Sequence, residues 1–94
     1  MTASQGHFET LAVHAGVLPD PSTGAIMTPI FATSTYVQTS PGKHQGYDYS
    51  RTANPTRSAL ETSIAALEGG RFALAMSSGC TGADVLMHAL NIGD

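Results

Sequence analysis

The chain has 94 residues, of which four are basic and seven acidic, and its formal net charge is −3. Contact with the phosphate backbone of nucleic acid requires a basic surface, so this charge argues against a nucleic-acid partner. The length accommodates one small domain at most, with a modest core. The apolar content of 41% is that of an ordinary globular protein.

Cysteine and histidine usage argues against disulfides and metal sites. The single cysteine excludes an internal disulfide and a cysteine-rich zinc site. The four histidines do not pair at metal-ligand spacing with one another, with the cysteine or with carboxylates, so we expect no metal. The first ten residues lack the basic and apolar regions of a secretory signal, and no apolar run approaches ~18 residues. These features predict no membrane contact and a cytoplasmic location.

Residues 1–54 have the composition of an extended arm, rich in Thr, Ser, Pro and Gly. Prolines at positions 19, 21, 29, 41 and 55 favour extended or turning backbone. Thr10–Ala15 has a brief helical pattern, and the β-branched and aromatic residues of Ile30–Val37 predict a short strand. An irregular segment of this length is uncommon inside a compact domain and is typical of a functional or intermolecular element.

Residues 55–94 have a regular pattern that begins with a helix. Asn54 is a favourable N-cap and Pro55 a favourable first helical residue. Three apolar side chains then recur at helical spacing and predict one buried stripe: Leu60, Ile64 and Leu67. Gly69 and Gly70 end this helix.

A strand and a second helix follow. Arg71–Met76 is short and nearly all apolar, as expected of a strand buried on both faces. The next helix is predicted to carry Asp84 in its first turn, where negative charge suits the helix dipole, and to end at Gly93. Its apolar stripe comprises Ala83, Leu86, Met87 and Leu90. The order of arm, helix, buried strand, glycine turn and helix is the opening of an α/β fold. A parallel unit would continue from there into a strand, so we expect the chain to be part of a longer protein.

The turn Ser77-Ser78-Gly79 is a candidate anion-binding site. The first N–H groups of a helix have no intrahelical partner, and the dipole adds partial positive charge. Gly79 has no Cβ, so an anion can approach its backbone closely. Packing alone explains many such turns, and on local pattern it is the favoured interpretation. The known phosphate loops GxxxxGK[ST] and GxGxxG do not match.

Cys80 stands where a thiol at a helix N-terminus ionises more readily, which suggests a nucleophile. A phosphatase-like loop would need an arginine six residues later, but that residue is Leu86. His88 lies two turns further along the same helix. A small packing residue is therefore the better interpretation of Cys80.

Tyr49 and Arg51 form a second candidate anion site. Two positions apart on an extended segment, they project to the same side. A guanidinium binds phosphate through paired hydrogen bonds, and a phenol adds a neutral donor. The alternative is that Tyr49 packs and that Arg51 pairs with a carboxylate. The local pattern leaves both interpretations open.

Four stretches in order, TPIFATSTYVQ, YSRTANPTRSALE, IAALEGG and ALAMSSG, resemble the amino-terminal part of the Cys/Met-metabolism enzymes that use pyridoxal phosphate (PLP). The resemblance runs from about Phe8 to the end of the chain. The Tyr-Ser-Arg-x-x-Asn-Pro-Thr block, Tyr49 to Thr56, is specific to this group. The opening AVHAGVLPDPSTGAIMTPIFATSTY is most similar to the gamma-lyase and gamma-synthase branch of these trans-sulfuration enzymes.

The resemblance implies a fold-type I PLP-dependent transferase, with residues 1–54 as an intersubunit arm and 55–94 as the start of the PLP-binding α/β domain. It implies that Tyr49 and Arg51 reach the cofactor phosphate of a neighbouring subunit. Gly79 and Cys80 would offer backbone N–H groups to the phosphate. A sulfur amino-acid substrate and a homotetramer are also implied. None of the catalytic residues would lie in this chain.

The sequence departs from the family pattern in two places. The family usually has Met or Leu where this chain has Cys80, a change that keeps the amide but alters packing under the cofactor. Thr81 and Gly82 also weaken the start of the helix. The lysine that binds the cofactor, the aspartate facing the pyridine nitrogen, the stacking tyrosine and the substrate-carboxylate arginine are all expected downstream. Lys43, the chain's single lysine, does not match the motif of the family lysine.

Overall fold

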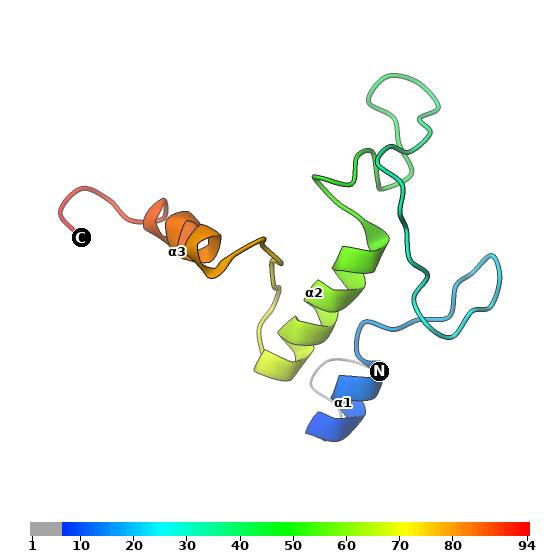
Figure 1. The fold of residues 1–94 in the computed structure, drawn as a ribbon, viewed down its shortest axis with the longest axis horizontal. Helices are drawn as coiled ribbons and strands as arrows, with labels where there is room; N and C mark the ends of the chain where they lie inside the picture. Colours follow the sequence, from blue (N-terminus) through cyan, green and yellow to red (C-terminus); the bar gives the residue numbers. More distant parts are fainter. Residues whose placement is uncertain (1–6) are drawn as a thin grey trace.

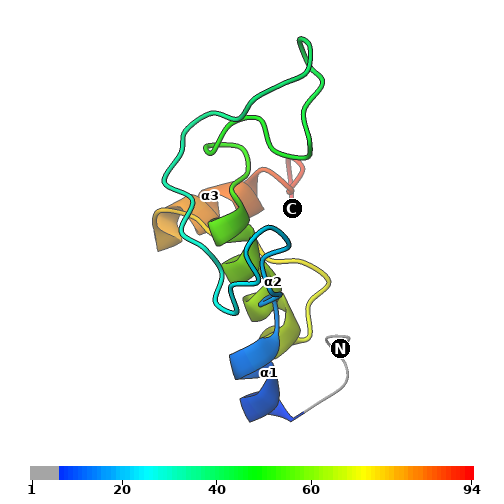
Figure 2. The ribbon, with the colours of Figure 1, turned by 90° about the vertical axis from the view of Figure 1, so that its right-hand side faces the viewer.

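The computed structural model describes residues 7–94, in which three helices are joined by long irregular segments (Figure 1). Helix α1 spans Phe8–His14, α2 spans Pro55–Glu68 and α3 spans Gly79–Met87. Helices α1 and α2 pack side by side, whereas α3 lies apart from both (Figures 1 and 2).

The chain is open in shape. Its extents are 52 × 43 × 20 Å, and its radius of gyration is 16.2 Å. A compact chain of this length would have a radius of gyration of about 12 Å. The hydrophobic core is correspondingly small, since the buried apolar side chains among residues 7–94 are Leu11, Ala65 and Ala66. Large apolar side chains of the second half therefore remain exposed.

The short helix predicted at Thr10–Ala15 is confirmed as α1, which begins two residues earlier and ends one residue earlier. Leu11 buries its side chain against α2. The chain leaves α1 through Gly16, whose φ is +77°, and a Cβ there would lie 2.5 Å from the carbonyl oxygen of Ala59. Glycine therefore allows the close approach of the two helices.

The predicted ends of α2 are confirmed. The Asn54 side chain accepts a hydrogen bond from the Thr56 amide at 2.9 Å, and Pro55 is the first helical residue. Gly69 ends the helix in the left-handed region, at φ 68°. The predicted buried stripe is only partly found: Leu67 is half-buried, but Leu60 and Ile64 are 55% and 43% exposed. The buried side chains of α2 are instead the small ones of Ala65 and Ala66.

The strand predicted at Arg71–Met76 does not form in this chain. The segment carries no ladder, and Phe72 and Leu74 are 74% and 64% exposed rather than buried on both faces. Ladder hydrogen bonds define a strand, and the described residues supply no neighbouring strand to make them. The strand expected at Ile30–Val37 is also wrong, since it is reduced to one isolated bridge between Thr35 and Tyr49. The helical elements and their order are thus present, but the sheet is not.

Helix α3 is shorter than predicted. It ends at Met87 with His88 as its C-cap, so Leu90 and Gly93 lie beyond it. Asp84 lies outside the first turn, contrary to expectation, and its carboxylate is 3.5 Å from His88 Nε2 in an exposed pair. Between His7 and Asp94, no helix has the length and apolar character needed to cross a bilayer.

Candidate phosphate-binding site

Tyr49 and Arg51 lie together, as predicted, but on a turn rather than on extended backbone. The amides of Thr52 and Ala53 both donate to the Tyr49 carbonyl oxygen at 3.0 Å, which closes the turn. Arg51 Nη2 donates to Tyr49 Oη at 3.4 Å, and the guanidinium carbon is 5.7 Å from the centroid of the Tyr49 ring. Both side chains are exposed, so a phenol and a guanidinium present their donors on one surface.

The alternative interpretation of Arg51, a carboxylate partner, is not found. Within the described part of the chain, the arginine paired with a carboxylate is Arg57, whose Nε lies 3.6 Å from Glu61 Oε1. Arg51 makes no such pair there, and its one side-chain hydrogen bond is the contact with the Tyr49 phenol. Its charge is thus not neutralised by residues 7–94.

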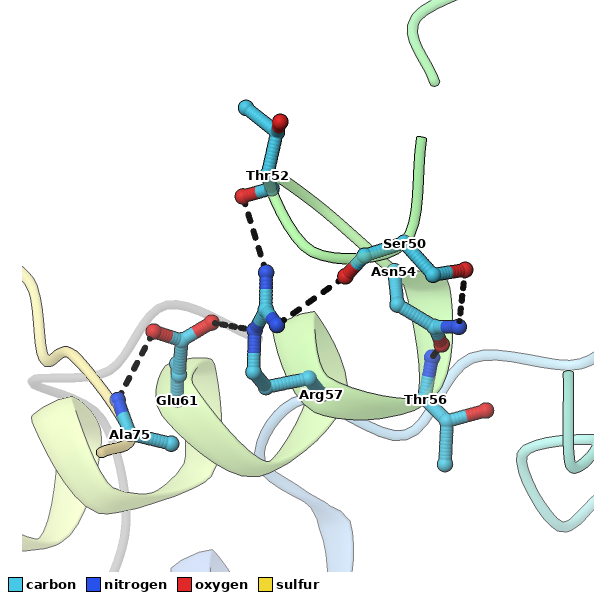
Figure 3. Close-up of polar contacts among 7 residues, drawn as sticks. All are labelled: Ser50, Thr52, Asn54, Thr56, Arg57, Glu61 and Ala75. Carbon is cyan, nitrogen blue, oxygen red and sulfur yellow. Dashed lines mark hydrogen bonds and ion pairs between the residues drawn. The ribbon is translucent and has the colours of Figure 1, made fainter. Parts of the chain in front are cut away.

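Sequence reasoning missed the residues that hold this turn. Ser50 Oγ donates to the Thr33 carbonyl oxygen, which ties the turn to the arm. The Asn54 amide donates to Ser50 Oγ and to the Phe31 carbonyl oxygen, both at 3.0 Å, while its oxygen caps α2 (Figure 3). Asn54 therefore fixes both the start of the helix and the turn. The capping role could be read from the sequence, but the two donor contacts depend on tertiary structure.

Arg57 is the second residue that the sequence did not single out. Its Nη1 donates to the Ser50 carbonyl oxygen at 3.1 Å and its Nη2 to the Thr52 carbonyl oxygen at 2.8 Å (Figure 3). These two carbonyls flank Arg51 in the chain. The i,i+4 spacing of Arg57 and Glu61 is a readable signal for their ion pair, but not for the carbonyl contacts.

The start of α3 has two open backbone donors. Ser78 is the N-cap, and its hydroxyl accepts from the Thr81 amide at 3.2 Å. The Gly82 amide donates to the Ser78 carbonyl oxygen. Within residues 7–94 the Gly79 and Cys80 amides have no hydrogen-bond acceptor. These are the two amides that the sequence predicted for phosphate.

The side chains around these amides leave room for an anion. A Cβ added at Gly79 would meet nothing within 4 Å. Cys80 is exposed, and no hydrogen bond of its thiol is present in the described region, so nothing there identifies a nucleophile. No group of three or more His, Cys, Asp or Glu in residues 7–94 is arranged to hold a metal ion.

A hollow of about 300 Å³ lies between the Tyr49–Arg51 turn and the segment that leads to α3. Arg51, Arg57 and Glu61 line one side of it, and Leu74 and Met76 line the other. The predicted donors are not brought into contact within one chain: no hydrogen bond among the described residues joins Tyr49 or Arg51 to the start of α3.

Two backbone amides at a helix N-terminus, one guanidinium and one phenol are all hydrogen-bond donors. A phosphate dianion is an acceptor only, and helix N-termini and arginine forks are its usual ligands. The donor set therefore fits the phosphate group of a cofactor. Such a donor set is typical of proteins that bind a phosphorylated cofactor.

Comparison with known proteins gives the family. The Cys/Met metabolism PLP-dependent enzyme family matches residues 9–94. The chain therefore belongs to this family of PLP-dependent enzymes, and pyridoxal phosphate is the cofactor of the family.

Individual relatives support this assignment. A cystathionine beta-lyase of Coxiella burnetii is 50% identical over 97 residues, which cover 100% of this chain and 25% of that protein. A probable cystathionine gamma-synthase of Herpetosiphon aurantiacus is 52% identical over 87 residues, covering 93% of this chain and 27% of that protein.

A solved structure shows the same fold. The crystal structure of cystathionine gamma-lyase from Lactobacillus plantarum, complexed with L-serine, matches with a TM-score of 0.83 and 43% identity. The match covers 95% of this chain and 23% of that chain. This chain thus spans about a quarter of the length of the proteins it resembles, and its fold corresponds to an N-terminal portion of theirs.

Proposed function

We propose that the complete protein containing this sequence is a PLP-dependent trans-sulfuration enzyme, a cystathionine gamma-lyase. It would convert cystathionine and water into cysteine, 2-oxobutanoate and ammonia. The observation that carries the proposal is the donor set on a chain of this family: two open amides at α3 and an unneutralised arginine beside a tyrosine. Bound PLP would supply an electron sink for the electrons left when the substrate loses its α-proton.

The residues of this chain would anchor the phosphate and contribute no catalytic group. Gly79 and Cys80 would donate their amides to the phosphate bound in their own subunit. Tyr49 and Arg51 would donate to the phosphate of a neighbouring subunit, which accounts for their separation from α3 within one chain. Residues 1–54 would then serve as the intersubunit arm, and residues 55–94 as the start of the cofactor-binding domain. The assembly would be a homotetramer built from dimers that share active sites.

Arg51 and Tyr49 provide the direct test of the anchoring role. In the complete protein, Arg51→Ala removes a charge-assisted contact of about 1.5–3 kcal/mol, so the Kd for PLP should rise roughly 10- to 150-fold. Tyr49→Phe removes a neutral donor and should weaken binding less. The measurement is titration of the apoprotein with PLP. Unchanged affinity in both variants would overturn the anchoring role of these two side chains.

Product analysis tests the reaction. Purified protein supplied with cystathionine and PLP should release cysteine and 2-oxobutanoate. Homocysteine and pyruvate would instead identify cleavage on the other side of the sulfur, the activity named for the Coxiella burnetii relative. Replacement chemistry that joins cysteine to an activated four-carbon amino acid would identify a gamma-synthase, the activity named for the Herpetosiphon aurantiacus relative. Elimination of the γ-substituent of methionine would identify a methionine gamma-lyase. The absence of all four activities would favour a catalytically inactive remnant.

A further inference from the structure

Arg57 connects the turn that carries Arg51 to helix α2. Its guanidinium donates to the carbonyl oxygens of Ser50 and Thr52, at 3.1 and 2.8 Å, on either side of Arg51 (Figure 3). Two bonds from one planar group, each to a different carbonyl, fix both the position and the orientation of the turn. The same guanidinium faces Glu61 one helical turn along, with 3.6 Å between Nε and Oε1.

Glu61 continues this connection to the other half of the site. Its second carboxylate oxygen, Oε2, accepts from the Ala75 amide at 3.0 Å (Figure 3). Ala75 stands three residues before Ser78, the N-cap of α3. Two side chains from one face of α2 therefore connect the turn that carries Arg51 to the segment that leads into α3, where the Gly79 and Cys80 amides lie.

An ordinary helix ion pair does not account for this arrangement. An i,i+4 pair stabilises its own helix through the contact between the two side chains. Here each member also bonds to backbone outside the helix, on opposite sides of the hollow beside Arg51. The side chains of Arg57 and Glu61 are only 32% and 19% exposed, so water screens them less than a surface pair.

We propose that Arg57 and Glu61 are positioning residues for the cofactor phosphate. They hold the turn that carries Arg51 and the segment that leads into α3 at a fixed position relative to each other. This inference rests on the proposed function. Arg57 acts on the phosphate through the turn that carries Tyr49 and Arg51, because both of its backbone contacts lie in that turn. Glu61 acts on both segments, because its two oxygens bond in opposite directions.

The test is the Kd for PLP of the complete protein, measured for single variants and again in an Arg51→Ala background. Arg57→Lys keeps the charge facing Glu61 but loses the fork that reaches both carbonyls. Its Kd should rise about tenfold, within the range for displacing one charge-assisted contact. In the Arg51→Ala background the same change should raise Kd by a clearly smaller factor, because only the Tyr49 phenol then remains for the turn to position.

Glu61→Gln should raise Kd in both backgrounds, since its uncharged oxygen accepts more weakly from the Ala75 amide and the entry to α3 is still affected when Arg51 is absent. Glu68→Gln is the matched control, an identical chemical change on the exposed C-terminal end of the same helix, and it should leave Kd unchanged. The melting temperature of each apoprotein separates loss of fold from loss of positioning. A structural role would lower it equally in both backgrounds without making the effect of Arg57→Lys on Kd depend on Arg51.

The outcomes separate this inference from the function on which it rests. If Arg51→Ala leaves Kd unchanged, the anchoring role fails and this inference fails with it. If Arg51→Ala weakens binding but Arg57→Lys multiplies Kd by the same factor in both backgrounds, only the positioning role is overturned. A Glu61→Gln variant that behaves like Glu68→Gln overturns the connection to α3.

Discussion

The Cys80 amide can be removed without removing a side-chain contact. Cys80 is the second residue of α3, and its amide has no acceptor among residues 7–94. Proline is tolerated in the first helical turn, where the missing N–H breaks no helix bond. The proline ring disfavours helical backbone at the preceding residue through clashes with its N–H and its Cβ, and Gly79, which has no Cβ, avoids the second of these clashes. Cys80→Pro should therefore delete one donor and leave the helix in place.

The expected effect follows from the kind of bond that is lost. One amide-to-phosphate hydrogen bond is charge-assisted and contributes about 1.5–3 kcal/mol, which corresponds to a rise in the Kd for PLP of roughly 10- to 150-fold. Cys80→Ala keeps the amide and removes only the exposed thiol, so its Kd should stay within about twofold of the parent protein. Titration of the complete apoprotein with PLP measures both. Equal affinities of the two variants, with equal melting temperatures, would refute the assignment of this amide to the phosphate.

Three further predictions concern the scaffold and use hydrogen exchange of the complete protein. Asn54→Ala should remove the N-cap and the bond that Asn54 donates to Ser50, which together stabilise the fold by about 1–3 kcal/mol, and should speed exchange at the start of α2 at least fivefold. Asn54→Asp should keep the cap and lose only the donor contacts. Gly16→Ala adds a clash with α2 to left-handed strain of about 1–2 kcal/mol and should release α1, whereas Gly24→Ala, at φ +74° with open space around it, should cost the strain alone. Hydrogen bonds from the hydroxyls of Ser22 and then Thr23 hold the pKa of Asp20 below its usual range. The stabilisation of that turn should be present above the unfolded pKa of about 3.9 and be lost as the pH falls through the lower folded value. Protection of the Thr23 amide that stays the same above and below this pH range, after correction for the intrinsic exchange rate, would contradict this.

Features encoded within a few residues were predictable from the sequence. The start and end of α2 depend on Asn54, Pro55 and Gly69, whose conformational preferences act locally. The open amides of α3 were predictable for the same reason, because they follow from the position of Ser78 as N-cap. The proximity of Tyr49 and Arg51 was predicted with the wrong backbone geometry, since a turn and a pleat both bring residues two apart together.

Features that depend on contacts with a distant segment were not predictable from local sequence. Where such a feature was predicted, as for the strand, the described residues lack the segment that it needs. Arg71–Met76 has the composition of a buried strand, but burial and ladder bonds require neighbouring strands that the described residues do not contain. The bonds from Arg57 to Ser50 and Thr52 depend on a turn whose shape is fixed by contacts with the arm. No local pattern in the sequence specifies that shape.

The contacts within the Tyr49–Arg57 block explain why Arg51 in particular is open to a ligand. The block contains two arginines, Arg51 and Arg57, and only Arg57 bonds to the backbone of the turn. Arg57 does so because the rigid first turn of α2 aims its side chain at the carbonyls of Ser50 and Thr52, and Glu61 offsets its charge. On the turn that Arg57 holds, Arg51 is exposed and lies beside the Tyr49 phenol. An outward, unneutralised guanidinium is costly to the isolated fold only if it is buried, and here it is exposed. The exposed Arg51 side chain therefore costs the fold little, and under the proposed function it contributes when the phosphate binds.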